Sequence, residues 1–368
     1  MKPEIFVTRP FLPPLDELLP LLKEIWDSRV LTNGGPFHKK LELALCESLG
    51  VNYISLFGNG TLALIAAMQQ LGVGGEVITT PYSFVATTNS LVWNRLTPVF
   101  VDIDRETLNL DPRKIEAAIT ERTCAILAVH CYGRPCDVES IQEIADRHRL
   151  KVVYDAAHAF GVNGRHGSLL LDGDLSVLSF HATKVFNTFE GGAVVCRDEA
   201  TKKHLDMLKN FGLTEELEVE EPGMNGKMSE FNAALGLVQL THMKEILEKR
   251  RAIHEVYLRR LAGVRGVLCS MHDAGEGQNF SYFPILIDSN YSLTRDGLFE
   301  RLRDAGVYSR KYFYPLISQF PLYRELASAK DENLPVACSI AQQVLCLPIY
   351  PELELSEAER IADLIVTA

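Results

Sequence analysis

The chain has 368 residues, of which 47% are hydrophobic and 23% charged, and its formal net charge is −11. This composition is typical of soluble globular proteins and excludes a disordered chain, while the acidic excess disfavours a nucleic-acid-binding surface, which needs clustered Lys and Arg. The apolar runs are shorter than the roughly 20 residues of a membrane span. The N-terminus lacks a signal-peptide pattern, so we expect a cytoplasmic protein without nucleic-acid or membrane partners.

The cysteines of the chain also favour a cytoplasmic protein. The eight cysteines are scattered, several of them within apolar runs, which predicts reduced thiols rather than a disulfide framework. Cys131 and Cys136 follow His130, a grouping that hints at zinc. No CxxC and no second ligand pair accompany them, so we expect no metal site.

Short apolar runs alternate with helical patterns from about residue 50 to 200. The runs are apolar along most of their length, as in strands buried on both faces of a mostly parallel sheet: Val51–Phe57, Glu76–Thr80, Pro98–Ile103, Cys124–His130, Lys151–Asp155, Leu175–Phe180 and Ala193–Cys196. Helices are expected between them at Leu62–Leu71, Phe84–Trp93, Pro112–Ile119 and Val138–His148. This alternation predicts an α/β domain with ligands at the strand ends.

The second half of the chain has a different pattern. A mainly helical stretch is expected from about 199 to 260, followed by a strand within 279–288 and helices near 292–305 and 335–345. These elements predict a smaller C-terminal α+β unit. We place the boundary inside a long helix, which gives a large α/β domain of residues 1–245 and a small domain of residues 246–368.

The turn Gly58-Asn59-Gly60-Thr61 joins a predicted strand to a predicted helix. Such a turn gathers free backbone N–H groups and the positive end of the helix at one point, which suits a phosphate. Thr61 adds a hydroxyl donor. Taken alone, the motif fits an ordinary strand-to-helix turn equally well.

Two polar residues follow the strand Lys151–Asp155. Asp155 at its carboxyl end can face a ring nitrogen above the sheet and keep a pyridine protonated, or it can simply cap a turn. His158 can hydrogen-bond a phenolic oxygen of the same ring, or it can be a structural histidine. Both interpretations remain open at this point.

Lys184 comes 29 residues after Asp155, just beyond the strand Leu175–Phe180. A lysine there is often an ion-pair partner, but in a partly desolvated pocket its pKa falls and it attacks carbonyls. Ser179 can reach the same phosphate as Thr61. Together, a Schiff-base lysine, an acid at a strand end and a phosphate turn are the parts that hold pyridoxal 5′-phosphate (PLP).

Five segments together resemble the DegT/StrS family of PLP-dependent nucleotide-sugar aminotransferases, which have the type I fold of such enzymes. They are Pro81-Tyr-Ser-Phe84-Val-Ala, Val99-Phe-Val-Asp-Ile-Asp104, Asp155-Ala-Ala-His158, Ser179-Phe-His-Ala-Thr-Lys184 and Glu190-Gly-Gly192. The resemblance extends from about residue 31 to residue 351. It implies a mostly parallel central sheet with helices on both faces, plus a smaller C-terminal α+β domain.

The resemblance also implies site roles. Lys184 matches the Schiff-base lysine and acid/base catalyst, and Asp155 matches its partner at the pyridinium nitrogen. His158 matches a residue beside the phenolic oxygen, and Phe84 an aromatic residue stacked on the ring. The matching phosphate-binding residues are Gly60, Thr61, Ser179 and, from the neighbouring subunit, Asn225. This last match implies a homodimer with shared active sites.

The substrate side is less defined. Many family members have an aromatic residue and proline where His181 and Ala182 stand here, and His181 either contacts substrate or packs. A nucleotide diphosphate needs cations, for which Arg310 and Lys311 are candidates. Tyr312 and Tyr314 are candidates for hydrogen bonds to sugar or phosphate.

The resemblance implies transamination in two halves. Glutamate converts PLP to pyridoxamine 5′-phosphate, which then aminates C4 of a dTDP-linked 4-keto-6-deoxyglucose for polysaccharide or glycan synthesis. Amination at C3, or of a UDP-linked 4-ketosugar, remains open. Sugar 3-dehydratases of this fold have His in place of the lysine, so Lys184 disfavours them. A ligand-sensing regulator would need a DNA-binding segment or a basic face, and the sequence has neither.

Overall fold

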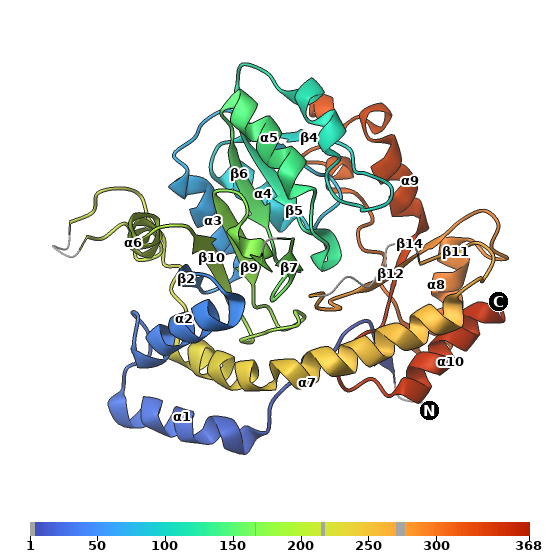
Figure 1. The fold of residues 1–368 in the computed structure, drawn as a ribbon, viewed down its shortest axis with the longest axis horizontal. Coiled ribbons are helices and arrows are strands. Elements are labelled where there is room, and N and C mark those ends of the chain that lie inside the picture. Colours follow the sequence, from blue (N-terminus) through green and yellow to red (C-terminus); the bar gives the residue numbers. More distant parts are fainter. Residues whose placement is uncertain (1–3, 166, 215–217, 270–276) are drawn as a thin grey trace.

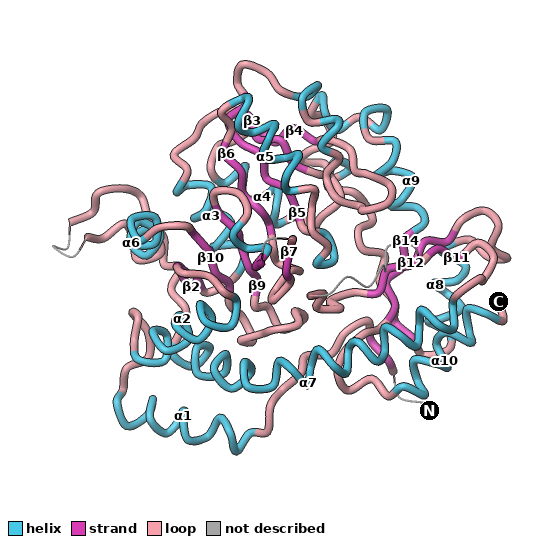
Figure 2. Tube along the Cα trace, viewed as in Figure 1, coloured by secondary structure: helices cyan, strands magenta, loops and turns pink. Residues whose placement is uncertain are grey.

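The computed structural model describes residues 4–165, 167–214, 218–269 and 277–368. Among them, a seven-stranded sheet forms the centre of the larger part of the molecule (Figures 1 and 2). Antiparallel β10 separates β2 from the other strands, which run parallel, so the predicted mostly parallel sheet is confirmed. In spatial order the strands are β2 (Tyr53–Phe57), β10 (Gly192–Cys196), β9 (Leu175–Ser179), β6 (Lys151–Asp155), β5 (Thr123–Val129), β3 (Glu76–Thr79) and β4 (Thr97–Phe100).

Helices cover both faces of this sheet, because successive side chains of a strand point to opposite sides. Val153 of β6 packs in a core with α3 (Gly60–Gln70), α4 (Ala86–Trp93) and α6 (Glu199–Leu208). Its neighbours Val152 and Tyr154 pack on the other side with α5 (Val138–His148). On that same side α2 (Pro36–Leu49) and the first half of α7 (Glu230–Leu261) cover β2, β9 and β10.

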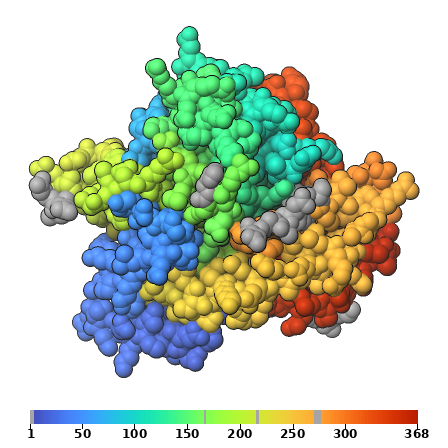
Figure 3. Space-filling view, in the orientation of Figure 1, coloured from blue at the N-terminus to red at the C-terminus, as the bar shows by residue number. Residues whose placement is uncertain are grey.

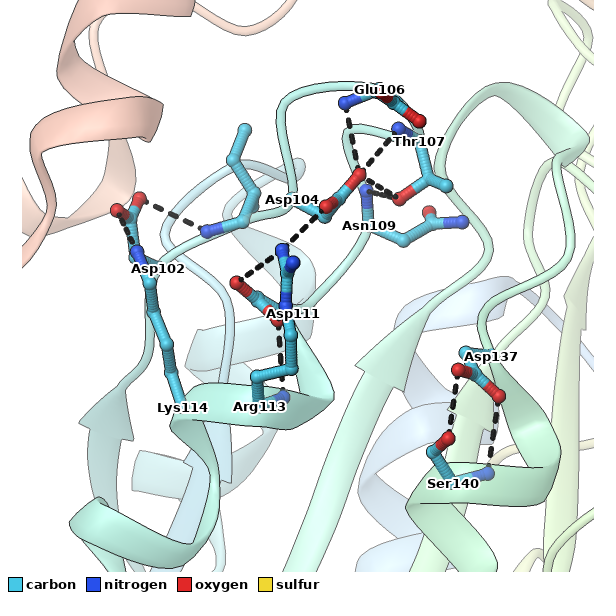
Figure 4. Close-up of polar contacts among 11 residues, drawn as sticks. Asp102, Asp104, Glu106, Thr107, Asn109, Asp111, Arg113, Lys114, Asp137 and Ser140 are labelled. Atoms are coloured by element: carbon cyan, nitrogen blue, oxygen red, sulfur yellow. Dashed lines mark hydrogen bonds and ion pairs between the residues drawn. The ribbon is translucent and has the colours of Figure 1, made fainter.

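One predicted helix is wrong. Residues 112–119 form two short 3₁₀ turns, Pro112–Lys114 and Glu116–Ala118. Local side-chain contacts hold this tight conformation, as Figure 4 shows: the carboxylate of Asp111 accepts from the backbone N–H of Arg113, and Lys114 reaches Asp102 at 2.8 Å. The mainly helical stretch expected from about 199 to 260 contains α6 and α7, with a non-helical segment between them. There the backbone pairs with the end of β2 through a 2.7 Å bond from Gly58 N–H to Gly226 C=O.

A smaller part follows in sequence. Its antiparallel sheet consists of β11 (Val267–Leu268), β12 (Phe283–Ile287) and β14 (Val344–Leu347). The helices around it are α8 (Arg295–Asp304), α9 (Pro335–Gln343), α10 (Leu355–Val366) and the end of α7. Ile246 packs with the large-part core and Ile253 with the C-terminal core. Figure 3 shows α7 in yellow, running under the molecule from one part to the other.

The N-terminal residues differ from the predicted division. Strand β1 (Ile5–Phe6) pairs in parallel with β13 (Val307–Tyr308), and Ile5 is buried in the C-terminal core. Strand β1 therefore lies beside the C-terminal part, while a division near residue 245 stays a prediction. None of the helices in the described ranges combines the length and hydropathy needed to cross a bilayer.

Candidate active site

The candidate site residues gather where strands end. Strands β2, β6 and β9 all point the same way, so the segments that follow them meet at one edge of the sheet. A cavity of about 760 Å³ lies at this edge. The predicted residues that line it are Gly60, Thr61, Phe84, Asp155, His158, Ser179, His181, Lys184 and Tyr312.

Asp155, the last residue of β6, is 5% exposed. Burial raises the pKa of its carboxyl group, whereas hydrogen bonds and the nearby Lys184 oppose this rise. The hydroxyl of Thr87 donates to Oδ2 at 2.7 Å, and the backbone N–H of Ala157 donates to Oδ1 at 3.1 Å. These donors stabilise a carboxylate that is otherwise costly to bury.

Lys184 lies in the loop after β9, in a turn closed by its own N–H and the carbonyl of His181. Burial disfavours the ammonium form and lowers the pKa of Lys184 to about 8, although the charge of Asp155 works in the opposite direction. A lysine with this pKa has a substantial neutral fraction near neutral pH. An amine with this pKa can act as a nucleophile and carry a proton.

His158 is 6% exposed, and burial holds its pKa well below the usual range, so the ring is neutral. Its Nδ1 accepts a hydrogen bond from the backbone N–H of Tyr132 at 3.2 Å. The ring proton must therefore be on Nε2, which makes Nε2 a donor. Tyr282 and Phe313 lie against the ring, with centroids 4.8 and 6.1 Å from it.

The turn before α3 has the geometry of an anion site. Asn59 caps the helix by accepting from Leu62 N–H at 2.9 Å, and its carbonyl accepts from Ala63 N–H at 3.2 Å. Within the described ranges, no hydrogen bond occupies the N–H groups of Gly60 and Thr61. A Cβ at Gly60 would lie 2.9 Å from the Cβ of Ser179, so glycine lets this turn approach Ser179 closely.

Four of the predicted residues have mixed positions. Phe84 is 61% exposed at the cavity, and His181 contacts Thr183 through Nδ1 at 2.8 Å. Lys311 pairs with Asp296 at 2.6 Å, and Tyr314 lies under the guanidinium of Arg295. Neither Lys311 nor Tyr314 lines the cavity.

Arg310 and Asn225 are both exposed and lie outside this cavity. The backbone of Arg310 bonds to that of Cys346 in β14, and Asn225 forms a bridge with Asn210. The chain itself therefore brings the lysine, the acid, the phosphate turn, His158 and Phe84 together. It leaves Asn225 and three of the predicted substrate residues apart from them.

The prediction missed several residues that line or support the cavity. Thr87 in the first turn of α4 donates to Asp155, and Ser83, which precedes α4, bonds to Thr87. The spacing of these two hydroxyls after a strand end was a usable signal. Tyr132, Tyr282 and Phe313 meet at His158 from positions as much as 155 residues apart. No local sequence pattern predicts such contacts.

These residues fit PLP. Lys184, whose lowered pKa allows a neutral amine, shares one cavity with the buried carboxylate of Asp155. The N-terminus of α3 borders this cavity with the two N–H groups described above and with the hydroxyls of Thr61 and Ser179. Gly60 has no room for a side chain, because an added Cβ would meet Ser179. An amine for the aldehyde, an acid for the ring nitrogen and donors for the phosphate are thus all present.

Comparisons with known proteins agree with this chemistry. The chain is 52% identical to a dTDP-4-amino-4,6-dideoxy-D-glucose transaminase of Escherichia coli, covering 98% of this chain and 97% of that protein. It is 54% identical to the Shigella dysenteriae protein of the same name, with 99% of each covered.

A solved structure of DesI, with its TDP-sugar product, superposes with a TM-score of 0.93 at 37% identity, over 100% of this chain and 93% of that one. Helicobacter pylori PseC, an aminotransferase of pseudoaminic acid biosynthesis, gives a TM-score of 0.91 at 30% identity, over 99% and 98%. The predicted fold and PLP-dependent enzyme class are confirmed. The family model of the DegT/DnrJ/EryC1/StrS aminotransferases matches residues 16–366, and the chain belongs to this family.

Proposed function

We propose that this enzyme transfers an amino group from glutamate to C4 of dTDP-4-keto-6-deoxyglucose and forms dTDP-4-amino-4,6-dideoxyglucose. The observation that carries the proposal is the presence of Lys184 and Asp155 in one cavity. The two relatives above 50% identity, whose names specify this product, support the choice of sugar and carbon. We place the reaction in the cytoplasm, as part of polysaccharide or glycan precursor synthesis.

Bound PLP supplies an aldehyde that condenses with amines and a pyridine ring that withdraws electrons from the substrate carbon. The chain supplies the rest. Lys184, with a pKa of about 8, would move a proton from the carbon that carries the donor's amine to the former aldehyde carbon, and in the second half of the cycle from there to the sugar carbon that receives the amine. Asp155, held by Thr87 and Ala157, keeps a proton at the ring nitrogen.

The remaining cofactor contacts follow from the same geometry. The N–H groups of Gly60 and Thr61, with the hydroxyls of Thr61 and Ser179, would hold the phosphate without a cationic side chain. His158 would donate from Nε2 to the phenolic oxygen, since Nδ1 is occupied by Tyr132. Phe84 would cover the open face of the ring.

For the sugar nucleotide, we propose contacts from the two substrate candidates that line the cavity, His181 and Tyr312. Arg310 is exposed, and we propose it for the diphosphate. Lys311 and Tyr314 already have partners in Asp296 and Arg295, and we propose that they support this segment instead.

We further propose a homodimer in which Asn225 reaches the phosphate of the partner's site. The chain exposes Phe84 and Trp93 beside the cavity, at 61% and 74%, and a second copy would cover such apolar area. Mixing inactive Lys184→Ala and Asn225→Ala chains tests the sharing. Heterodimers then contain one intact site and regain activity if Asn225 acts across the interface, whereas no site is intact if it acts within its own chain.

The substrate is tested with the purified enzyme, PLP and glutamate. The sugars offered are dTDP- and UDP-linked 4-keto-6-deoxyhexoses and a dTDP-linked 3-keto-6-deoxyhexose, and products are read by mass and by the NMR position of the amine. We expect the C4 amine from the dTDP-linked glucose derivative at a kcat/KM well above the others. Amination at C3, or a preference for the UDP sugar, would overturn the assignment. Borohydride reduction with PLP should label Lys184.

A further inference from the structure

The turn that carries His158 is held from outside the large part of the molecule. It spans residues 156–160, with a bond from Ala159 N–H to Ala156 C=O at 2.8 Å. The amide of Asn279 donates to the carbonyl of His158 at 2.8 Å and to that of Phe160 at 3.0 Å. Asn279 lies four residues before β12 and is 2% exposed, so these are buried bonds.

The orientation of the Asn279 amide is itself fixed. Its Oδ1 accepts from the backbone N–H of Ser281 at 3.1 Å, which leaves Nδ2 to face the two carbonyls. The hydroxyl of Ser281 lies 2.9 Å from the His158 carbonyl and 2.7 Å from Oδ1 of Asn279. One buried side chain thus uses its whole hydrogen-bonding capacity to join two distant segments.

Gly133 packs closely against the same His158 carbonyl and against Asn279. Gly133 has a φ of +85°, and a Cβ there would lie 2.6 Å from the His158 carbonyl and 2.9 Å from Oδ1 of Asn279. The preceding residue, Tyr132, donates its N–H to Nδ1 of His158. The carbonyl of His158 therefore contacts both Gly133 and Asn279, and its ring contacts Tyr132, Tyr282 and Phe313.

We propose that Asn279 is a positioning residue: from the C-terminal part it fixes the turn of residues 156–160 and so holds the His158 ring at the cavity. Asn279 itself does not line the cavity and acts through His158. The inference rests on the proposed function only for the role of His158 toward the cofactor. The position of the turn is a property of the protein without cofactor and can be measured there.

The first test is hydrogen exchange of the cofactor-free protein, read at the amides of Ala157 and Ala159. Asn279→Ala leaves two buried carbonyls without their donor, and we expect exchange about tenfold faster. Asn94→Ala is the matched control, because Asn94 also donates to two backbone carbonyls, those of Ile65 and Ser90, and neither belongs to the turn of residues 156–160. Unchanged exchange in Asn279→Ala, or an equal change in Asn94→Ala, would overturn the proposal.

The second test asks whether Asn279 acts through His158. In the loaded enzyme, Asn279→Ala should lower kcat about tenfold, change the KM for glutamate less, and shift the visible absorption band of the bound cofactor. In a His158→Ala background the same substitution should have little further effect. Additive losses would overturn the proposal. Should Asn279→Ala fail to fold, Ser281→Ala, which keeps the amide, must give a smaller change in the same direction in both tests.

Discussion

The hydroxyl of Thr87 donates a 2.7 Å hydrogen bond to Oδ2 of Asp155 and lies 2.8 Å from the hydroxyl of Ser83. Because an ionised carboxylate only accepts, the proton of Thr87 is directed at Asp155, and Ser83 must donate to Thr87. The segment from Ser83 into the first turn of α4 thus provides a chain of two successive donors, the second of which bonds to the buried acid. This chain opposes the rise in the pKa of Asp155 that burial causes.

Thr87→Val tests that chain. The substitution keeps the shape and removes the donor, so we expect the pKa of Asp155 to rise further and kcat to fall at least tenfold, since a hydrogen bond to a charged group contributes about 1.5–3 kcal/mol. Thr88→Val is the control: the adjacent hydroxyl is buried without a partner among the described residues. Steady-state kinetics of both variants measure the two kcat values. An equal loss of kcat in Thr87→Val and Thr88→Val would contradict the role of Thr87.

The lowered pKa of Lys184 predicts how the reactivity of its amine depends on pH. Below about pH 8 most of the amine is protonated, so its reactive neutral fraction should rise about tenfold per pH unit and level off above pH 8. Brief acetylation of the cofactor-free protein between pH 6 and 10, followed by peptide mapping, measures this fraction. Lys244, with a side chain 90% exposed, reports the pH dependence of the reagent in the same digest. A Lys184 profile that parallels Lys244 would contradict a shifted pKa.

Local signals in the sequence predicted the elements that carry the chemistry. The bounds of β6 and α5 agree with the prediction because each has a clear end: Asp155 closes an apolar run, and Asp137 caps α5 by accepting from Ser140 N–H. Lys184 and Gly60 were identified from their positions after strands. Whether they perform the proposed roles stays a prediction.

Contacts across long sequence separations were not predictable in the same way. Asn279 and Phe313 act at His158 only because the C-terminal part folds back against the strand ends, and no pattern in residues 277–315 indicates this. The 3₁₀ turns at residues 112–118 depend similarly on Asp102 and Asp104, which bind Lys114 and Arg113 from the preceding loop. Periodicity alone cannot distinguish such turns from a short α-helix.

Gly60→Ala should weaken cofactor binding. The new Cβ would lie 2.9 Å from the Cβ of Ser179, so the start of α3 must move away from the phosphate site. A shift of this kind in a positioned group can cost about a hundredfold in activity, and we expect at least tenfold weaker PLP binding. Absorbance titration of the cofactor-free protein measures it. Gly74→Ala, with no atom within 4 Å of the added carbon, should bind PLP normally.

Asp102 joins the two parts of the molecule, and its removal should cost more stability than the loss of an ordinary helix cap. Its carboxylate, 1% exposed, accepts from the N–H groups of Val336 and Ala337 at the start of α9, at 3.0 and 2.8 Å, and from Lys114. Asp102→Ala leaves these donors unpaired, and we expect a loss of about 3 kcal/mol in urea denaturation. Asp137→Ala removes an exposed cap of α5, labelled with its partner Ser140 in Figure 4, and should cost about 1 kcal/mol. Equal losses would mean that Asp102 is only another cap and that α9 is held to the sheet by apolar packing.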